Sequence, residues 1–329
     1  MTSSSLLLAF ALGLTLHPYE AVEPHMGTLF RIKLYASDEV QAKKAFRAAF
    51  ARITELDNEL SDYKPDSELN RVARSAVHRP QPASEDLLRV VKAAEKLSGA
   101  TGGEFDITIG PLTHLWREAR KTGRVPSRET VAAARAKCGY RKLHVNAAKH
   151  TIEFDQEGMQ LDAGAIAKGD AADQALAVLK QCGIQSALVA ASGDLAFSDA
   201  PPGEAGWKIG VDSLDRAQAP FTRVLLLSNA AVSTSGATQQ HLDADGRRYS
   251  HILDPKSGIG LTSEMTVSVV AQRGMDADSL ATAVSVLGVN RGIDLIEKQP
   301  GAAALVLHQV NGRPVLAESR RFHELKTMP

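Results

Sequence analysis

A carboxylate and a hydroxyl lie one helical turn apart near the C-terminal end of this chain. Asp278 and Thr282 are four residues apart, so on a helix both side chains share one face. Together with a carbonyl oxygen from elsewhere in the fold, such groups suit a hard cation such as Mg²⁺. The alternative is that Asp276 or Asp278 only caps the start of the helix, which is the commoner role of such an aspartate. The spacing alone leaves both interpretations open.

Residues 161–169 (LDAGAIAKG) form a second candidate, in which a strand leads through small residues into a helix. Small residues let a ligand approach the backbone closely, and a helix start offers free N–H groups to an anion. Asp162 could accept a hydrogen bond from a ring N–H or a sugar hydroxyl, and Lys168 could meet a phosphate. A tight strand-to-helix turn with a surface lysine is the alternative.

Residues 249–258 (YSHILDPKSG) place one histidine beside an apolar pair, Ile252 and Leu253, and a DPxxG turn. His251 could take a proton from a hydroxyl nucleophile. The alternative is a structural histidine that is satisfied by a backbone carbonyl, which is the more common fate of a lone histidine.

Two further segments offer aromatic rings on loops. Residues 60–69 contain Tyr63, and residues 103–108 contain Phe105 between two carboxylates, Glu104 and Asp106. Either ring could flank a flat ligand, and either could equally belong to the core.

The composition limits the function classes. The chain has 329 residues, 44% hydrophobic and 23% charged, which is ordinary for a globular protein. Lys plus Arg and Asp plus Glu are both 38, so the formal net charge is zero. A nucleic-acid or acidic-membrane partner is not expected, because it would need a basic excess or patch. Cys138 and Cys182 form no CxxC pair, so neither a zinc site nor a disulfide framework is expected.

The N-terminus carries an apolar run, Leu6 to Leu16. A transmembrane helix needs about 20 such residues, so this run fits the apolar stretch of a secretory signal better. Against a signal, no Lys or Arg precedes Arg31 and no clean A-x-A site follows. A buried first strand or helix is the alternative. We expect residues 1–22 to be a signal or N-terminal segment, residues 23–329 to be one domain, and the protein to be exported to the periplasm or cell envelope rather than cytoplasmic.

Hydrophobic periodicity and turn residues predict the elements that position these groups. Helices are expected at 38–60, 84–97, 127–137, 276–287 and 290–298, and another runs from the Gly/Ala-rich passage after residue 162 to about 182. Strands are expected at 27–36, 142–145, 151–154, 186–191, 207–211, 223–227, 231–234, 266–271, 302–308 and 314–317. Strands and helices do not alternate strictly, which favours an α+β or mixed-sheet domain over a doubly wound parallel sheet. The chain has neither a Rossmann fingerprint nor a P-loop.

Taken together and in this order, the segments resemble the ApbE family, the FAD:protein FMN transferases. The resemblance covers about Met26 to Val306. It includes residues 26–28 (MGT), 60–70 (LSDYKPDSELN), 102–112 (GGEFDITIGPL), 161–173 (LDAGAIAKGDAAD), 232–236 (VSTSG), 249–258 and 276–288 (DADSLATAVSVLG).

The resemblance implies a single α+β catalytic domain with a mixed, T-fold-like sheet. It implies Mg²⁺-dependent transfer of the FMN half of FAD to a threonine hydroxyl of a target flavoprotein, with release of AMP. The implied Mg²⁺ ligands are the Ala165 carbonyl, the Asp278 carboxylate and the Thr282 hydroxyl, and His251 is our candidate base. The implied FAD contacts are Met26, Tyr63, Glu104, Phe105, Asp106, Asp162, Lys168, Ile252 and Leu253.

The chain departs from the family pattern at two places. The usual Gly-Gly-Asp is Ser192-Gly193-Asp194 here, which puts contacts to the adenine nucleotide half in doubt. Ala281 stands where some members have an acidic residue, so a second metal ion is less expected.

The target is expected to carry an S-G-A-T-type motif. The chain has these letters itself at residues 235–238, but Val232 replaces the acidic residue that the motif requires, so self-modification is not expected. A FAD pyrophosphatase and a non-enzymatic periplasmic FAD carrier are the rival functions.

Overall fold

A computed structural model describes residues 15–212, 221–236 and 240–328. Most of the apolar run that starts at Leu6 lies outside these ranges, as do Ala237 and Thr238 of the S-G-A-T sequence. Strand β1 (His17–His25) begins inside the expected N-terminal segment and pairs with β2 (Thr28–Ala36) along its whole length. The sheet therefore includes the chain from His17 onward. Within the described ranges, no helix has the length and apolar character needed to cross a membrane.

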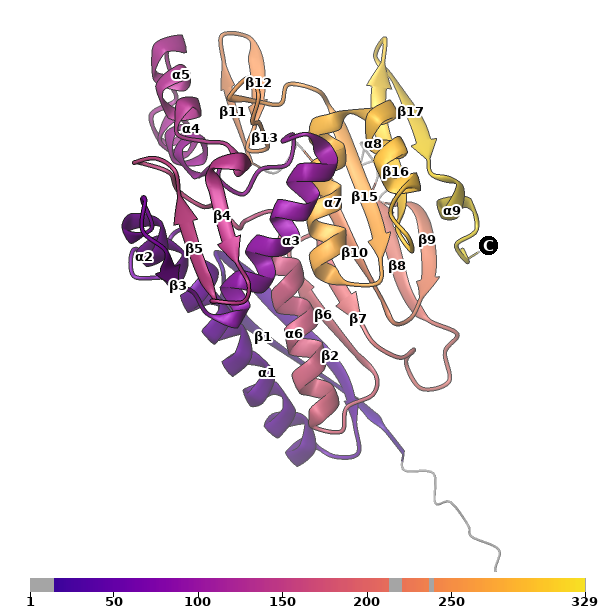
Figure 1. Cartoon of the computed structure of the whole chain (residues 1–329). Helices are drawn as coiled ribbons and strands as arrows, with labels where there is room; N and C mark the ends of the chain where they lie inside the picture. Colours follow the sequence, from indigo (N-terminus) through magenta and orange to yellow (C-terminus); the bar gives the residue numbers. More distant parts are fainter. Residues whose placement is uncertain (1–14, 213–220, 237–239, 329) are drawn as a thin grey trace, which may run out of the picture.

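The fold is built on one large sheet of eight strands (Figure 1). Its order is β1, β2, β6 (Ala187–Ala191), β7 (Asp194–Phe197), β10 (Ala230–Gly236), β15 (Met265–Ala271), β16 (Ala303–Val310) and β17 (Arg313–Glu318). Every neighbouring pair is antiparallel. The α+β class is confirmed, with the refinement that the large sheet is antiparallel rather than mixed.

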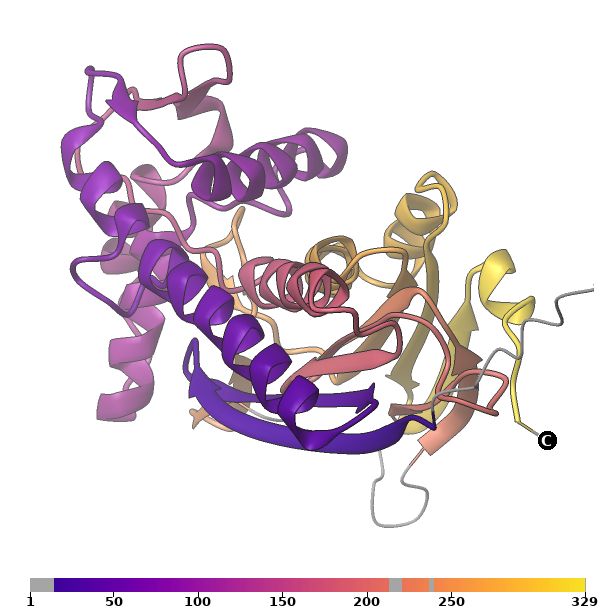
Figure 2. The same ribbon diagram turned by 90° about the horizontal axis from the view of Figure 1, so that it is seen from below.

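Helices cover one face of this sheet (Figure 2). They are α1 (Glu39–Leu60), α6 (Ala167–Gln181), α7 (Gly274–Leu287) and α8 (Val289–Glu297), and α3 (Glu85–Thr101) packs on α1 and α7 further from the sheet. Asp38 caps α1 by accepting from the Gln41 N–H, and Ser84 caps α3 by accepting from the Leu87 N–H. The buried faces of these helices and the inner strands form the largest apolar cluster of the protein.

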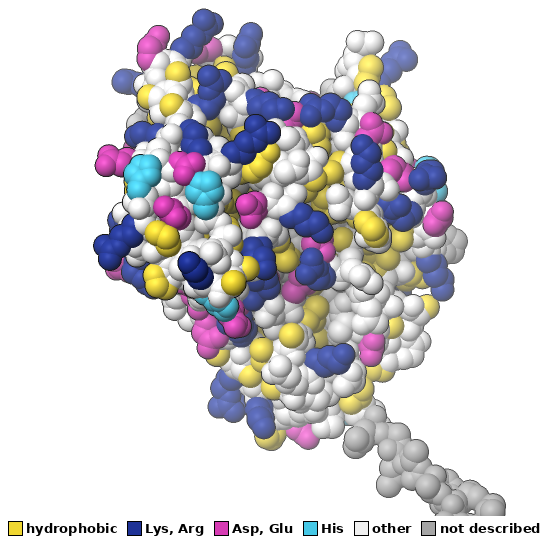
Figure 3. All heavy atoms as spheres, in the orientation of Figure 1, with side chains coloured by type: hydrophobic (Ala, Val, Ile, Leu, Met, Phe, Trp, Pro, Cys, Tyr) yellow, Lys and Arg dark blue, Asp and Glu magenta, His cyan; other side chains and the backbone are white. Residues whose placement is uncertain are grey.

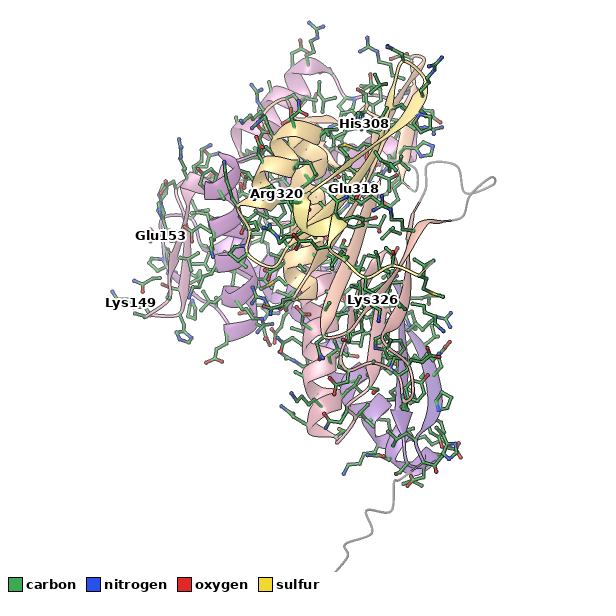
Figure 4. The ribbon with its side chains drawn as sticks, turned by 90° about the vertical axis from the view of Figure 1, so that its right-hand side faces the viewer. Lys149, Glu153, His308, Glu318, Arg320 and Lys326 are labelled. Carbon is green, nitrogen blue, oxygen red and sulfur yellow. The ribbon has the colours of Figure 1, made fainter. Side chains whose placement is uncertain are left out.

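The opposite face of the sheet is covered by a separate hairpin, β8 (Trp207–Asp212) and β9 (Phe221–Leu227). Trp207 and Leu225 pack with Phe197 of the sheet and with Phe322 of α9 (Arg320–His323). The C-terminal segment runs beside β9, since the Leu226 N–H donates to the Lys326 carbonyl at 2.8 Å. Figure 4 shows this edge, with Glu318 and Arg320 where β17 meets α9.

The residues between α1 and α6 form a lobe beside the sheet. It contains α2 (Glu68–Ser75), β3 (Gln81–Pro82), α3, α4 (Gly110–Thr122), α5 (Arg128–Ala136), a 3₁₀ turn (Tyr140–Lys142), β4 (Leu143–Asn146) and β5 (Thr151–Phe154). On the surface in Figure 3, basic and acidic side chains both appear across the face, which fits the zero formal charge.

Two small hairpins connect this lobe to the sheet. They are β11 (His241–Ala244) with β12 (Arg247–Ser250), and β13 (Leu253–Asp254) with β14 (Ile259–Gly260). A separate apolar cluster joins Leu112 and Trp116 of α4 to Leu242 and Leu253 of the hairpins. The Trp116 indole N–H also donates to the Gly258 carbonyl at 2.8 Å. These contacts fix the loop that carries His251 against the lobe.

Candidate functional site

A pocket of ≈ 640 Å³ lies between the lobe and the sheet. Its volume is in the range of small-molecule and cofactor sites. Every residue that the sequence singled out lines it: Met26, Tyr63, Glu104, Phe105, Asp106, Asp162, Ala165, Lys168, His251, Ile252, Leu253, Asp278 and Thr282. The structure therefore brings together segments that are more than two hundred residues apart. The contact of each residue with a ligand stays a prediction.

A backbone contact between two glycines joins the first turns of two helices beside the pocket. A Cβ atom at Gly169 of α6 would lie 2.1 Å from the Gly274 carbonyl oxygen, and one at Gly274 of α7 would lie 2.4 Å from the Gly169 oxygen. The Asp173 carboxylate accepts from the N–H groups of Gly274 and Met275 at 2.6 and 3.0 Å. The first turns of α6 and α7 are thereby locked together, which places Lys168 beside Asp278.

The alternative that Asp278 is an N-cap is wrong. Helix α7 begins at Gly274, and Asp173 of another helix satisfies its first N–H groups. Asp278 lies further along the helix, where its Oδ2 accepts from the Gly169 N–H at 3.2 Å. Burial, reinforced by the negative charge of Asp194, raises the pKa of Asp278 to about 7.

The alternative that Lys168 is a surface lysine is also wrong. Its Nζ donates to the Gly164 carbonyl at 2.8 Å and lies 3.1 Å from Asp194 Oδ2 and 3.4 Å from Asp278 Oδ2. Burial acts to lower the pKa of Lys168, but the two carboxylates outweigh it and hold the pKa above its ordinary value. Lys168 is therefore a charged ammonium group surrounded by oxygen atoms.

The oxygen atoms around this position fit Mg²⁺. Ala165 and Thr282 line the same pocket as Asp278 and Asp194, so carbonyl, hydroxyl and carboxylate oxygens are all available, and these are ligands that a hard cation prefers. The Lys168 ammonium shows that the Gly164, Asp194 and Asp278 oxygens accommodate a positive charge. No group of three or more His, Cys, Asp or Glu side chains that could hold a metal occurs within the described residues. A cation here would depend on carbonyl, hydroxyl and ligand oxygens as well.

His251 lies on the opposite wall with one nitrogen engaged. Its Nδ1 is 3.2 Å from the Gln240 carbonyl oxygen, and its backbone N–H donates to the same oxygen at 2.9 Å. A carbonyl only accepts, so Nδ1 carries the proton and Nε2 keeps a free lone pair. Burial lowers the pKa of His251 below its ordinary value, aided by the positive charges of Arg120 and Lys168. The ring is therefore neutral at pH 7, the form that a general base requires.

Tyr63 is held at the pocket mouth by Arg117 of α4. The guanidinium carbon lies 4.0 Å from the ring centroid, and Tyr63 as a residue is 63% exposed, so the other face of the ring is available to a flat ligand. Arg117 also bonds Asp62 and lies 3.4 Å from Asp162 Oδ2. Burial, together with the charge of Asp162, raises the pKa of Asp62 to about 7 against the pull of Arg117.

The carboxylates of residues 104–106 are already engaged within the protein. Glu104 Oε1 accepts from Lys256 Nζ at 2.7 Å and from Arg291 Nη2 at 2.5 Å. Asp106 accepts from the N–H and hydroxyl of Thr108 and from the Tyr140 N–H. Asp106 thus shapes the loop that carries Phe105.

The sequence did not identify Asp62, Arg117, Arg120, Asp194 and Gln240 as site residues, although all of them line the pocket. Arg117 and Arg120 lie on α4, a helix that was not predicted. Asp62 and Asp194 stand inside recognised motifs, but nothing in their spacing distinguishes them from ordinary turn residues.

Ser192 occupies a strained position in the turn between β6 and β7. Its φ is +58°, a region that side chains with a Cβ rarely adopt. A Cβ on the next residue, Gly193, would lie 2.8 Å from the Thr234 carbonyl oxygen, so only glycine fits there. The chain therefore departs from the usual Gly-Gly-Asp only at the first glycine. It keeps the second glycine, Gly193, which the contact with Thr234 requires.

We expect Ser192→Gly to raise the free energy of unfolding by roughly 0.5–1 kcal/mol, because glycine adopts positive φ without steric cost but loses more chain entropy on folding. Urea unfolding measures the change. Ser192→Ala is the matched control, since it removes the hydroxyl and keeps the strain. A Ser192→Gly protein that is less stable than both others would show that the turn is not strained.

The chain is similar to known proteins over the segments that line the pocket. Residues 26–306 match the ApbE family profile. A protein named FAD:protein FMN transferase from Treponema pallidum (strain Nichols) is 32% identical over 305 residues, covering 88% of this chain and 84% of its own. One of the same name from Vibrio cholerae is 30% identical over 301 residues, covering 90% and 89%.

Solved structures agree with these sequence relatives. The flavinyl transferase ApbE of Pseudomonas stutzeri, in its apo form, superposes with a TM-score of 0.82 at 31% identity, covering 94% of this chain and 97% of that one. The flavin transferase ApbE of Vibrio cholerae gives a TM-score of 0.85 at 29% identity, covering 94% and 100%.

Proposed function

This chain belongs to the ApbE family and is a FAD:protein FMN transferase, and we propose that it joins the FMN half of FAD to a threonine hydroxyl of a target flavoprotein, using Mg²⁺ and releasing AMP. The observation that carries this proposal is one pocket to which all seven segments of the resemblance contribute, with carbonyl and carboxylate oxygens around the Lys168 ammonium and a neutral His251 in its lining. Export to the periplasm or cell envelope is part of the proposal.

The proposed reaction is a displacement at phosphorus. The threonine Oγ1 forms a bond to the FMN-side phosphorus, the bond from that phosphorus to the bridging oxygen breaks, and AMP leaves. Bound Mg²⁺ supplies charge neutralisation for the phosphate oxygens. The Ala165 carbonyl, Asp278 and Thr282 would hold it.

The remaining roles belong to side chains on the pocket walls. His251 Nε2 takes the proton of the threonine hydroxyl, since Nδ1 is already committed to Gln240. Tyr63, prepositioned by Arg117, stacks on one face of the flavin ring. Met26, Phe105, Ile252 and Leu253 line the same pocket and exclude water from the ring.

The test is a covalent label. The protein is incubated with FAD, Mg²⁺ and a flavoprotein domain that carries an S-G-A-T-type acceptor threonine, and the domain is weighed by mass spectrometry. We expect the domain to gain the mass of one FMN less one water, with AMP released in equal amount. A domain whose acceptor threonine is replaced by valine is the control and should gain nothing.

The same experiment separates the rival functions. A FAD pyrophosphatase would use water as the nucleophile and would release free FMN and AMP without labelling the domain. A carrier would leave FAD intact. Either result would contradict the proposed transfer.

A further inference from the structure

Two aspartates from distant parts of the chain face the same ammonium group. Asp194 is the first residue of β7 and Asp278 lies on α7, yet their Oδ2 atoms are 3.1 and 3.4 Å from Lys168 Nζ. Both carboxylates are buried and both residues line the pocket. The family resemblance links the motif Ser192-Gly193-Asp194 to the adenine nucleotide half of the substrate and gives Asp194 no part in the cation site.

Asp194 is oriented toward this position by the sheet. Its Oδ1 accepts from the Ser233 hydroxyl at 2.5 Å, and Ser233 is its direct partner in the pairing of β7 with β10. Its Oδ2 is then directed at Lys168. Asp278 is oriented in a similar way, since its Oδ2 is bound by the Gly169 N–H and its Oδ1 has no hydrogen-bond partner among the described residues.

Lys168 fills the space between these oxygens. Its ammonium group contacts one carbonyl oxygen and two carboxylate oxygens, which are the ligand types that a divalent cation takes from a protein. An ammonium group and a metal ion cannot share these atoms, because their charges repel and their volumes overlap.

We propose that Asp194 and Asp278 together form the cation site and that the Lys168 ammonium occupies it until a divalent cation displaces it. Displaced Lys168 remains at the start of α6 on the pocket wall, where it can bind a phosphate oxygen of the substrate. The metal and the lysine therefore compete for the two carboxylates, and the Ala165 carbonyl and the Thr282 hydroxyl would complete the coordination of the metal. This inference rests on the proposed function for the identity of the cation.

The test is the affinity for Mg²⁺ alone, measured by titration calorimetry on the FAD-free protein. We expect Lys168→Met to bind Mg²⁺ at least about tenfold more tightly than the wild type, because the competing charge is gone. Asp194→Asn should bind at least about tenfold more weakly, because one carboxylate is lost. Thermal melting establishes that each variant is folded.

Two control variants keep the charge change and move it away from the site. Lys256→Met removes a lysine that pairs with Glu104 at 2.7 Å, and Asp276→Asn removes a carboxylate of the same helix as Asp278, where it pairs with Arg273 at 2.8 Å. Both should bind Mg²⁺ as the wild type does. If these controls changed the Mg²⁺ affinity as much as the site variants do, the affinity would depend on the general charge near the pocket. That result would overturn the proposal.

A second readout follows Lys168 itself. Acetic anhydride labelling, analysed by peptide mass spectrometry, should modify Lys168 faster when saturating Mg²⁺ is present, because the displaced amine is no longer bound by carboxylates. The proposed exchange would be wrong if Lys168 were labelled equally with and without Mg²⁺, or if Lys168→Met bound Mg²⁺ no more tightly than the wild type. A wild-type protein that binds no Mg²⁺ would instead contradict the metal part of the proposed function.

Discussion

Asp278→Ala is expected to lower the rate of FMN transfer by at least about 10³-fold at saturating FAD, because a metal's charge stabilisation of the transition state is worth several kcal/mol. Asp278 is the one carboxylate that we assign both to the cation position and to the helical face shared with Thr282. Its loss removes a charged oxygen from that position and an acceptor from the Gly169 N–H. Single-turnover labelling of the acceptor domain over a range of Mg²⁺ concentrations measures the effect.

Asp278→Asn removes the charge of this side chain and keeps its shape. The amide oxygen can still accept from the Gly169 N–H, so the packing of α6 against α7 should survive, while the charge is lost. We expect transfer to fall nearly as far as in Asp278→Ala, with a melting temperature close to that of the wild type. Near wild-type transfer in either variant, with unchanged dependence on Mg²⁺, would refute the assignment of Asp278 to the metal.

Part of the local arrangement of the site could be predicted because it depends on short spacings. Asp278 and Thr282 share a helical face whatever surrounds them. The small residues near Gly164 indicate that a ligand could approach the backbone closely there. The situation of Lys168 could not be predicted in this way. It depends on the contact of Gly169 with Gly274, a meeting of two helices that no local pattern encodes.

Helix α4 could not be predicted from the sequence for a different reason. Its buried positions are Gly110, Leu112, Trp116 and Ala119, a narrow apolar stripe on an otherwise charged segment that begins with Gly110 and Pro111. The stripe is short because α4 packs against small hairpins rather than against the large sheet. Arg117 and Arg120 were missed together with the helix that carries them.

Some missed elements had a readable signal. Asp245-Gly246 joins β11 to β12 as a two-residue turn with φ values of +52° and +69°, and Asp-Gly is a strong hairpin signal. Met26-Gly27 makes the same kind of turn between β1 and β2, with φ values of +48° and +71°. These hairpins matter to the site because one ends at His251 and the other presents Met26 to the pocket.

His251→Ala is expected to slow transfer by about 10²–10⁴-fold while FAD binding stays close to that of the wild type, since a general base acts in the transition state rather than in binding. The geometry favours a base because Nδ1 is held by the Gln240 carbonyl and Nε2 is left without a proton. FAD affinity by fluorescence titration and the single-turnover rate together distinguish a base from a structural histidine, whose loss would weaken FAD binding and lower the melting temperature.

The pH dependence of the transfer rate tests the same assignment of His251 as the general base. Burial lowers the pKa of His251 below 6.5, so the ring is neutral and active at pH 7 and becomes protonated only as the pH falls below that value. The wild-type rate should therefore fall on the acid side of pH 6.5, and His251→Ala should lose this dependence when both proteins are measured at saturating Mg²⁺, which keeps Asp278 ionised. His241→Ala is the matched control, because it changes the same hairpin at a residue outside the pocket lining and should keep both the rate and its pH profile. If His251→Ala binds FAD normally and transfers FMN at the wild-type rate, the hydroxyl must be activated without a histidine, through the cation position alone.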